Sequence, residues 1–504
     1  MRELKFPRLA YNWLSTAGAF IAIISGLLML LFLGISLSGS GENPYFGIFL
    51  YMVLPPFLLG GLLLIPIGMF RQWRRWKKYG EETFPKWPYI DFNKRSHRNM
   101  TVIFFFGTIL FLVVSAVGSY EAYHFTESIT FCGKICHKVM KPEHMAYQNS
   151  PHARVSCVAC HVGPGAGWYA KSKLAGAYQV YAVTFDKFPR PIPTPIKNLR
   201  PAQETCEQCH WPDKFFGAQQ RQFNHYMYDS ENSHWPINML IKTGGGDPKT
   251  GQTAGIHWHM NIGVLVEYIA RDERRQDIPY VRITDKTTGR VTVYENTEHP
   301  LTEEEMKSAV VRKMDCMDCH NRPSHIYNSP DHAIDVAILT GRIDHTIPDI
   351  KKIAVESMAK VYETEDTAMA EIASIVTSFY RREMSELYQQ RRTTIDEAIK
   401  AIQEAFSQNI FPEMKVRWSD YSNNIGHFIY PGCMRCHEGK HQSQDGLMIT
   451  RQCRTCHTIL SQGSGTREVM ATTQDGLDFV HPDENTGEAW KEMGCYECHS
   501  GVQP

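Results

Sequence analysis

The chemistry of this chain is indicated first by its cysteines, which fall into seven pairs, each followed at once by a histidine. Six pairs have the spacing C-x-x-C-H, and the first, CGKICH, has one residue more. Two thiols a helical turn apart can each form a thioether to a haem vinyl group, and the next histidine then reaches the iron. The pattern therefore predicts seven covalent c-type haems. The predicted attachment residues are Cys132, Cys136, Cys157, Cys160, Cys206, Cys209, Cys316, Cys319, Cys433, Cys436, Cys453, Cys456, Cys495 and Cys498. The predicted iron ligands that follow them are His137, His161, His210, His320, His437, His457 and His499.

Other uses of these cysteines fit the sequence less well. Structural zinc sites use cysteine pairs without an obligatory adjacent histidine, and a disulfide framework needs no histidine at all. The chain has 53 basic and 53 acidic residues, a balance that argues against a nucleic-acid partner. No glycine pattern of a nucleotide-binding turn appears. Electron transfer by haem is the chemistry that remains.

The second axial ligand decides whether a haem carries electrons or binds a substrate, because two protein ligands leave no open position. Of 22 histidines, seven lie in the motifs and His97 is predicted to be cytoplasmic, which leaves 14 for seven sites. We therefore predict that most haems have two histidine ligands. The candidates for the second ligand are His152, His225, His257, His325, His427, His441 and His481.

Three uncharged runs, at 9–41, 43–70 and 99–120, are each long enough for a membrane helix of about 20 residues. The segments at 1–8 and 71–98 are rich in Lys and Arg, which predicts that both are cytoplasmic. A cleaved signal peptide is the alternative for the first run, and it would leave the placement of the body unchanged. We expect a bacterial inner-membrane protein whose haem domains face the periplasm.

The fold class predicted is a membrane-anchored, mainly α protein with large irregular haem-packed regions and a small β-hairpin insertion. Val281 and Ile283 alternate with polar residues across a turn from Val291 and Val293, which indicates the hairpin. The predicted parts are a three-helix anchor at 1–120, a tetrahaem domain at 121–335 with the insertion near 211–300, a haem-free helical segment at 336–424 and a trihaem domain at 425–504.

Two local patterns add to this. Thr302 and Glu305 form a capping box for a helix expected to run to Asp315. Within 349–407, apolar residues recur with helical spacing from Ile395 to Phe406, which predicts a helix packed on a core.

The stretch from FCGKICHKVM at residue 131 to the following GAYQVYA resembles the NapC/NirT family of membrane-anchored multihaem quinol dehydrogenases, over roughly residues 100–335. The motif count, the three helices and the segment PGCMRCHEGKH resemble the ImcH-type seven-haem inner-membrane cytochromes of metal-respiring bacteria. The resemblance implies that quinol is oxidised beside the first haem. It also makes Met140 an alternative to His137 as ligand of that haem. Lys171 and Lys173 match the family's lysine, and Gln179 stands where the family has an aspartate.

A quinol gives up two protons with its two electrons, so its site needs a base or hydrogen-bond acceptors at the outer membrane face. Glu121 and His124 follow the third membrane run directly. We therefore expect Lys173, with Glu121 or His124, to border the first haem.

These patterns predict a menaquinol or related quinol dehydrogenase that delivers electrons through seven haems to soluble periplasmic c-type cytochromes in anaerobic or metal respiration. One alternative is a terminal reductase with an open haem site, and another is a relay subunit of a larger respiratory complex. Residues 121–504 carry 41 basic and 48 acidic side chains, which favours docking of a basic partner. We expect the trihaem domain to be the docking end.

Overall fold

The computed structural model of the chain describes residues 8–37, 54–80, 91–135, 137–196, 199–215, 217–245 and 255–502. The predicted haem cysteine Cys136, the side chain of His137 and the start of the second membrane run lie outside the described residues. The chain divides into two units, which are described separately. The first unit is Met1–Ser128 with Cys157–Val180, and the second is Ile129–Ser156 with Tyr181–Pro504.

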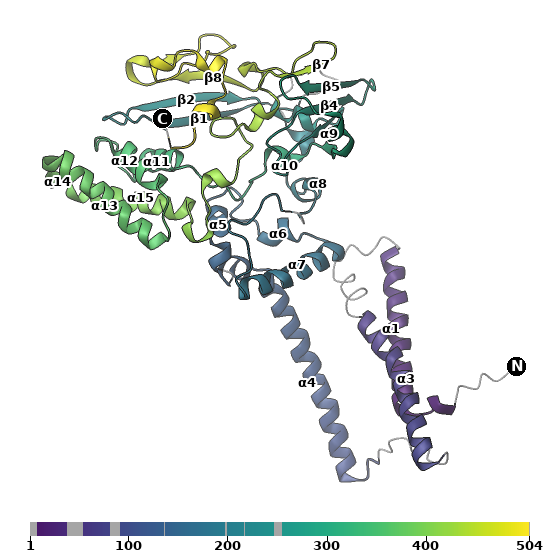
Figure 1. Ribbon diagram of the computed structural model, residues 1–504. Helices are drawn as coiled ribbons and strands as arrows, with labels where there is room; N and C mark the ends of the chain where they lie inside the picture. The colour runs from purple at the N-terminus through teal and green to yellow at the C-terminus, as the bar shows by residue number, and fades with distance from the viewer. Residues whose placement is uncertain are drawn as a thin grey trace. The chain divides into compact units, whose positions relative to one another are not determined.

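The first unit contains three long helices, α1 (Trp13–Leu37), α3 (Leu54–Tyr79) and α4 (Arg95–Thr126) (Figure 1). Each contains a segment long and apolar enough to span a membrane, which confirms the three membrane helices predicted from the sequence. On α4, large apolar side chains such as Phe104, 74% exposed, point away from the protein. Helices are suited to a bilayer because every backbone polar group inside them is satisfied within the segment.

Helices α1 and α3 pack through small residues. A Cβ atom on Gly18 would lie 2.6 Å from the carbonyl oxygen of Gly61, so only glycine permits this approach. Nearby, the Ser15 hydroxyl donates to the carbonyl oxygen of Ile65 at 2.9 Å. Small residues and interhelical hydrogen bonds take the place of the hydrophobic effect inside a membrane.

The second unit has a helical core, built from the segment predicted to be haem-free and helical. Its helices are α11 (Pro330–Leu339), α12 (Ile350–Ala359), α13 (Glu365–Glu383), α14 (Ser385–Gln390) and α15 (Arg392–Asn409). The apolar face of α15 is buried as the periodicity predicts, with Ile395, Ile402 and Phe406 all at 0% exposure. These residues belong to one continuous core that also includes Val376 of α13 and Met358 of α12. Apolar residues that recur with helical spacing lie on one face of the helix, and this face is the one buried in the core.

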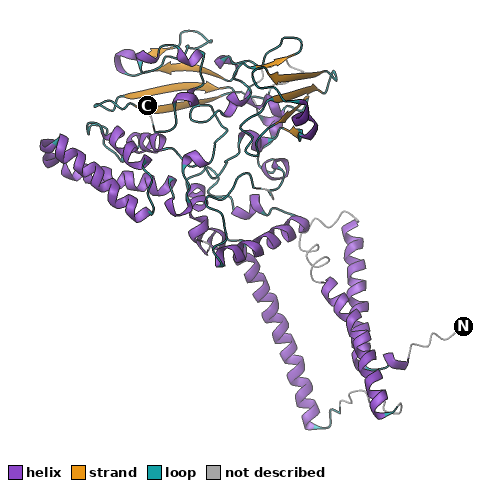
Figure 2. Ribbon diagram, viewed as in Figure 1, coloured by secondary structure: helices purple, strands orange, loops and turns teal. Residues whose placement is uncertain are grey.

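Two antiparallel sheets complete the second unit (Figure 2). The first has the order β1-β2-β8-β9, and the second has the order β6-β3-β4-β5-β7. The strands are β1 (Gln219–Tyr226), β2 (His234–Ile241), β3 (Val264–Ile269), β4 (Tyr280–Asp285), β5 (Val291–Asn296), β6 (Arg312–Lys313), β7 (His441–Ser443), β8 (His457–Gln462) and β9 (Val469–Met470). The predicted hairpin is confirmed as β4 and β5, which pair Val281 with Tyr294 and Ile283 with Thr292. The mainly helical fold is also confirmed, and the β-structure is larger than the hairpin predicted, because the hairpin is part of a five-stranded sheet and the chain forms a second sheet of four strands.

Both sheets join segments that are far apart in the sequence. Strand β8 pairs with β2, and β7 pairs with β5, so the last 80 residues contribute strands to both sheets of the insertion. Trp235 and Ile237 of β2 pack on Ile459 of β8. The division into tetrahaem and trihaem domains stays a prediction.

The capping box predicted at Thr302 is present, and Thr302 Oγ1 accepts a hydrogen bond from the Glu305 backbone at 3.2 Å. Its helix α9 (Glu303–Ser308) is shorter than predicted. The chain leaves it at Ala309 in an extended conformation, because Arg312–Lys313 pairs with β3 as strand β6. The residue where the helix was expected to end, Asp315, instead caps the next helix, which carries the fourth motif.

Candidate functional site

In the second to the seventh motif the first cysteine lies on a single helical turn. These turns are α6 (Cys157–His161), α8 (Ala202–Cys206), α10 (Cys316–Cys319), α16 (Cys495–Cys498) and the 3-10 turns Gly432–Arg435 and Cys453–Thr455. In α6, α10 and α16 the second cysteine lies on the turn as well. In four motifs the histidine backbone N–H donates to the carbonyl of the first cysteine, for example His320 to Cys316 at 2.8 Å. This bond fixes the histidine one turn after the first thiol. The cysteines described form no disulfides, so their thiols are available for thioethers.

The first motif has a different local structure. Residues Phe131–Ile135 form a π-helical turn, which is wider than an α-helical turn. A wider turn accommodates the extra residue of CGKICH between the two cysteine positions. Gly133 inside this turn lies against the ring of His144 on α5 (His137–Gln148), since a Cβ atom there would be 2.2 Å from the His144 Cδ2 atom. Met140 also lies on α5.

Five of the motif histidines each face a second histidine. The pairs are His152 with His210, His257 with His320, His259 with His437, His427 with His457, and His481 with His499. Their ring centroids are 5.9 to 6.2 Å apart. Imidazole nitrogen binds a transition metal at about 2 Å, so two rings on opposite sides of one iron have centroids about 6 Å apart. The residues present therefore fit haem iron between each pair.

Backbone carbonyls orient several of these rings. The Nδ1 atom of His152 lies 3.1 Å from the Pro323 oxygen, and that of His257 lies 2.6 Å from the Thr243 oxygen. A carbonyl accepts only, so Nδ1 is the protonated nitrogen and Nε2 keeps its lone pair for a metal. His325 has the same arrangement, with Nδ1 3.0 Å from the Glu143 oxygen.

Two of the candidate second ligands are placed differently. Both ring nitrogens of His441 face oxygen atoms, Nδ1 at 2.7 Å from Glu438 Oε1 and Nε2 at 2.7 Å from the Ile278 carbonyl, and the side chain is fully buried. Neither nitrogen is available to iron. The expectation for His441 therefore does not fit this geometry.

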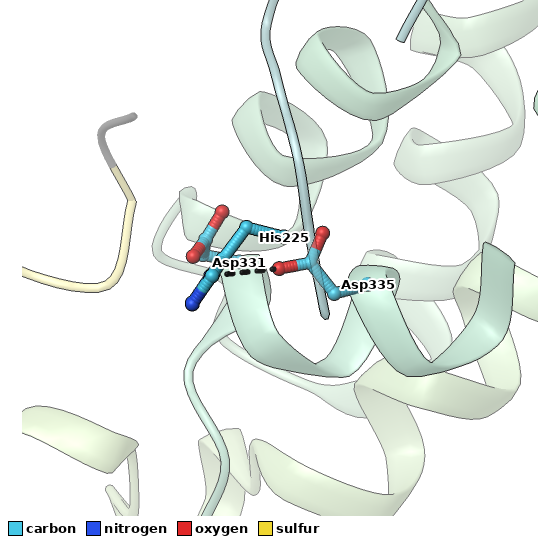
Figure 3. Close-up of side chains that lie close together, drawn as sticks. All are labelled: His225, Asp331 and Asp335. Carbon is cyan, nitrogen blue, oxygen red and sulfur yellow. Dashed lines mark ion pairs between the residues drawn. The ribbon is translucent and has the colours of Figure 1, made fainter. Parts of the chain in front are cut away.

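His225 lies beside two carboxylates of α11, Asp331 and Asp335 (Figure 3). Its Nδ1 atom is 3.8 Å from Asp335 Oδ2. The carboxylates are compensated by Lys351, whose Nζ lies 2.7 Å from Asp331 Oδ1 and also contacts Asp335. The ring of His225 contacts Phe428, with centroids 5.4 Å apart, rather than forming a sixth pair. Burial lowers the pKa of His225 to about 4, so the ring is neutral at neutral pH.

The motif cysteines of the second unit also form a spatial series. The pKa of Cys316 is lowered by a hydrogen bond to Cys206, and the pKa of Cys319, which burial raises to about 12, is raised further by the charge of Cys433. Burial raises the pKa of Cys456 and of Cys495, and the nearby charges of Cys433 and Cys453 raise these two pKa values further. From the third motif to the seventh, each motif therefore lies close in space to the motif that follows it in the sequence. A path for electrons needs such a series of close neighbours.

In the first unit, the side chain of Lys173 on α7 (Ala166–Thr184) meets the end of α4. Its Nζ lies 3.6 Å from Glu127 Oε1 and donates to Thr126 Oγ1 at 3.3 Å. It also lies 4.9 Å from the centre of the Tyr169 ring. Glu127 is mostly shielded, with 17% of its side chain exposed. An ammonium and a shielded carboxylate are thus held together beside an aromatic ring.

The other residues expected near Lys173 are more open. Glu121 and Gln179 are exposed, on α4 and α7 respectively. His124 is also exposed and its ring stacks edge-on against Tyr120, with centroids 4.4 Å apart. The acid that the structure brings to Lys173 is therefore Glu127.

Comparison with known proteins shows the family of this chain. Residues 94–191 match the N-terminal region of the NapC/NirT cytochrome c family. Cytochrome c-type protein ImcH of Geobacter sulfurreducens is 44% identical over 489 residues, which cover 97% of this chain and 95% of that protein. The chain belongs to the NapC/NirT cytochrome c family. No solved structure matches it.

As a NapC/NirT cytochrome, the chain is a multihaem c-type cytochrome of membrane electron transport, carrying several covalent haems. The sequence of this NapC/NirT cytochrome did not lead us to two residues of the site, His259 and Glu127. His259 is two residues from a chosen candidate, His257, and Glu127 is six residues after Glu121. The sequence signal for His259 was the H-W-H spacing, which places two imidazoles on one short turn.

Proposed function

We propose that this chain is a quinol dehydrogenase, which oxidises menaquinol in the membrane and passes electrons through seven c-type haems to periplasmic acceptor cytochromes. The observation that carries the proposal is the set of five histidine pairs at 5.9 to 6.2 Å. Two ligands close both axial positions of an iron, which suits an electron carrier and disfavours a substrate-binding haem. The series of neighbouring motifs supports the same role.

The residues that would hold the haems follow from these pairs. Bound haem supplies a one-electron couple, and the protein fixes its axial ligands and their orientation. His152, His257, His427 and His481 are proposed as second ligands for the third, fourth, sixth and seventh haems. His325 is proposed as a further axial ligand, because the Glu143 carbonyl holds its ring as the paired rings are held. For the first haem, His137 and Met140 remain alternatives.

The pair of Lys173 and Glu127 is proposed as the quinol site. Oxidation of a quinol to a quinone releases two electrons and two protons. The Lys173 ammonium can donate a hydrogen bond to a quinol oxygen, and the Glu127 carboxylate can accept a proton from it. The 3.6 Å separation of the two groups supports a shared role, since one quinol oxygen can reach both. Glu121 and His124 lie one to two turns before Glu127 on α4, and they are proposed to border the same site from the membrane side.

The placement in the membrane is proposed from charge. Loops rich in Lys and Arg remain in the cytoplasm, so the N-terminus and 71–98 would lie there and the second unit in the periplasm. This puts the Lys173 site at the outer face, where protons are released on the same side as the acceptor. Soluble c-type cytochromes are the partners that fit.

The test is the reduction of the full-length holoprotein in liposomes by a menaquinol analogue. The rate of reduction is measured by the change in haem absorbance. Lys173→Ala is expected to slow this reduction about 10-fold or more, because it removes a group that contacts the quinol. Lys171→Ala is the matched control, since Lys171 lies on the same helix and its Nζ stacks on Trp168 at 4.8 Å. Reduction by dithionite should be unchanged in both variants.

Other outcomes would favour other functions. A parent protein that dithionite reduces but quinol does not would be a relay subunit, with quinol handled elsewhere. A ferrous haem in the parent protein that binds carbon monoxide and turns over an oxyanion would indicate a terminal reductase.

A further inference from the structure

The 3-10 turn Ile256–Met260 presents two histidines to two different haem motifs. The ring of His257 faces His320 of the fourth motif at 6.2 Å, and the ring of His259 faces His437 of the fifth motif at 5.9 Å. Each has its Nδ1 against a carbonyl oxygen, at 2.6 Å from Thr243 for His257 and at 2.9 Å from Ile256 for His259. In both rings Nδ1 therefore carries the proton and Nε2 keeps its lone pair for a metal.

The residue between them fixes the turn to the protein. Trp258 packs on the core of the second sheet, which includes Val266 and Tyr268 of β3, and Cys436 of the fifth motif packs on the same core. The turn and the fifth motif are thus held by one set of apolar contacts. A further histidine close to that motif, His441, has both nitrogens bonded to oxygen atoms and offers no ligand.

The two motifs are also joined directly. Arg435, inside the fifth motif, donates to the carbonyl oxygen of Asp318, inside the fourth, at 2.7 Å. The Asp318 carboxylate is 2% exposed and accepts from the Tyr268 hydroxyl at 2.6 Å and from Arg275 at 2.8 Å. Charge-assisted and buried hydrogen bonds of this kind hold groups rigidly. The fourth and fifth motifs are therefore fixed to each other on the attachment side as well.

We propose that the Ile256–Met260 turn binds two haems at once, with His257 as second ligand of the fourth and His259 as second ligand of the fifth. Electrons cross from the first four haems to the last three at this turn. The inference needs haem in both motifs, as the proposed function does, but it does not need quinol as the electron donor.

The two sites differ in a way that a spectrum can report. The rings of His257 and His320 are nearly parallel, with 4° between their planes, whereas those of His259 and His437 are nearly perpendicular, at 87°. In low-spin ferric haem, parallel imidazole planes give a rhombic electron paramagnetic resonance spectrum, and perpendicular planes give one dominated by a single large g value. The fourth haem should contribute the first kind of signal and the fifth haem the second.

The experiment compares His257→Ala and His259→Ala in the purified full-length holoprotein, with His299→Ala as control because His299 is an exposed histidine outside the pairs. Each of the first two variants should convert one haem to a high-spin form that binds carbon monoxide when reduced. His259→Ala should lose one large-g signal, and His257→Ala one rhombic signal. Added imidazole should restore the low-spin spectrum, which separates a lost ligand from a misfolded chain.

Three results would overturn the inference. These are a fully low-spin His259→Ala protein, loss of the same signal in both variants, or a high-spin haem that imidazole does not restore. Intact mass is measured on the same samples. A parent chain lacking haem in either motif would refute the haem content of the proposed function, whereas a full complement with an unchanged spectrum would refute this inference alone.

Discussion

The ammonium of Lys351 lies fully buried, 2.7 Å from the carboxylate of Asp331. It also contacts Asp335, which is 2% exposed, so one cation compensates two acids inside the helical core. Removing one member of a buried ion pair leaves an uncompensated charge, which costs about 3–5 kcal/mol. This relationship makes Lys351 the residue on which the charge balance of α11 and α12 depends.

We therefore expect Lys351→Met to lower the thermal unfolding midpoint by several degrees, measured by circular dichroism of the holoprotein. The neighbouring exposed Lys352→Met is the control and should leave the midpoint unchanged. Equal stability of the two variants would show that Asp331 and Asp335 are neutralised by another route.

The haem count is tested by intact mass. The holoprotein should exceed the 57.8 kDa chain by seven haem masses. Replacing both Cys132 and Cys136 by serine should remove one haem mass and no more. A parent protein that already has six haems would mean that the π-helical first motif does not accept haem.

Gly133→Ala should perturb the first haem. Its new Cβ would meet the His144 ring at 2.2 Å, so the π-helical turn or α5 must move. We expect incomplete attachment or a changed spectrum for one haem. Gly176→Ala on α7, where a Cβ meets nothing within 4 Å, should behave as the parent. An unchanged spectrum in both proteins would argue against a tight fit around Gly133.

Glu127→Gln should slow reduction by quinol by roughly 10²-fold, because a glutamine cannot take the proton that a general base accepts. Reduction by dithionite should not change. Glu121→Gln, at the exposed position on α4, is expected to have the smaller effect. If Glu121→Gln is the slower protein, the base lies there and Glu127 serves to position Lys173.

Electron transfer to a basic acceptor cytochrome should slow as salt is raised. The second unit and its flanks carry an excess of acidic side chains, and salt screens charges over about 10 Å at 0.1 M. Stopped-flow rates between low salt and 0.5 M report this. A rate that does not depend on salt would indicate that the acceptor cytochrome docks through apolar contacts.

Local patterns predicted the local structures. Each of these patterns involves only a few neighbouring residues, and each has its counterpart in the structure. They are the haem motifs, the capping box at Thr302 and the apolar face around Ile402. The hairpin of β4 and β5 was found for the same reason. What these features share is that their partners lie within one turn or one hairpin.

Long-range pairing could not be predicted in the same way. Strand β1 is largely exposed and lacks the alternation of a half-buried strand, so nothing local marks it. The same holds for the candidate second ligands: only the surrounding oxygen atoms show that both ring nitrogens of His441 are hydrogen-bonded, whereas Nδ1 of His259 faces a carbonyl and leaves Nε2 for a metal. Glu127 was overlooked because α4 continues past residue 120, which changes the acid that faces Lys173.

The pairing of β2 with β8 also limits when the first sheet can form during synthesis of the chain. Residues 234–241 pair with a strand more than 200 positions later, so the first sheet is complete only after almost the whole chain has been synthesised. Contacts of such sequence separation form late in folding. Until then the cysteines of the fourth to the sixth motifs, which lie between the two strands in the sequence, belong to a segment that this sheet has not yet closed. The late strand therefore completes the sheet only after the cysteines of six of the seven motifs have been synthesised.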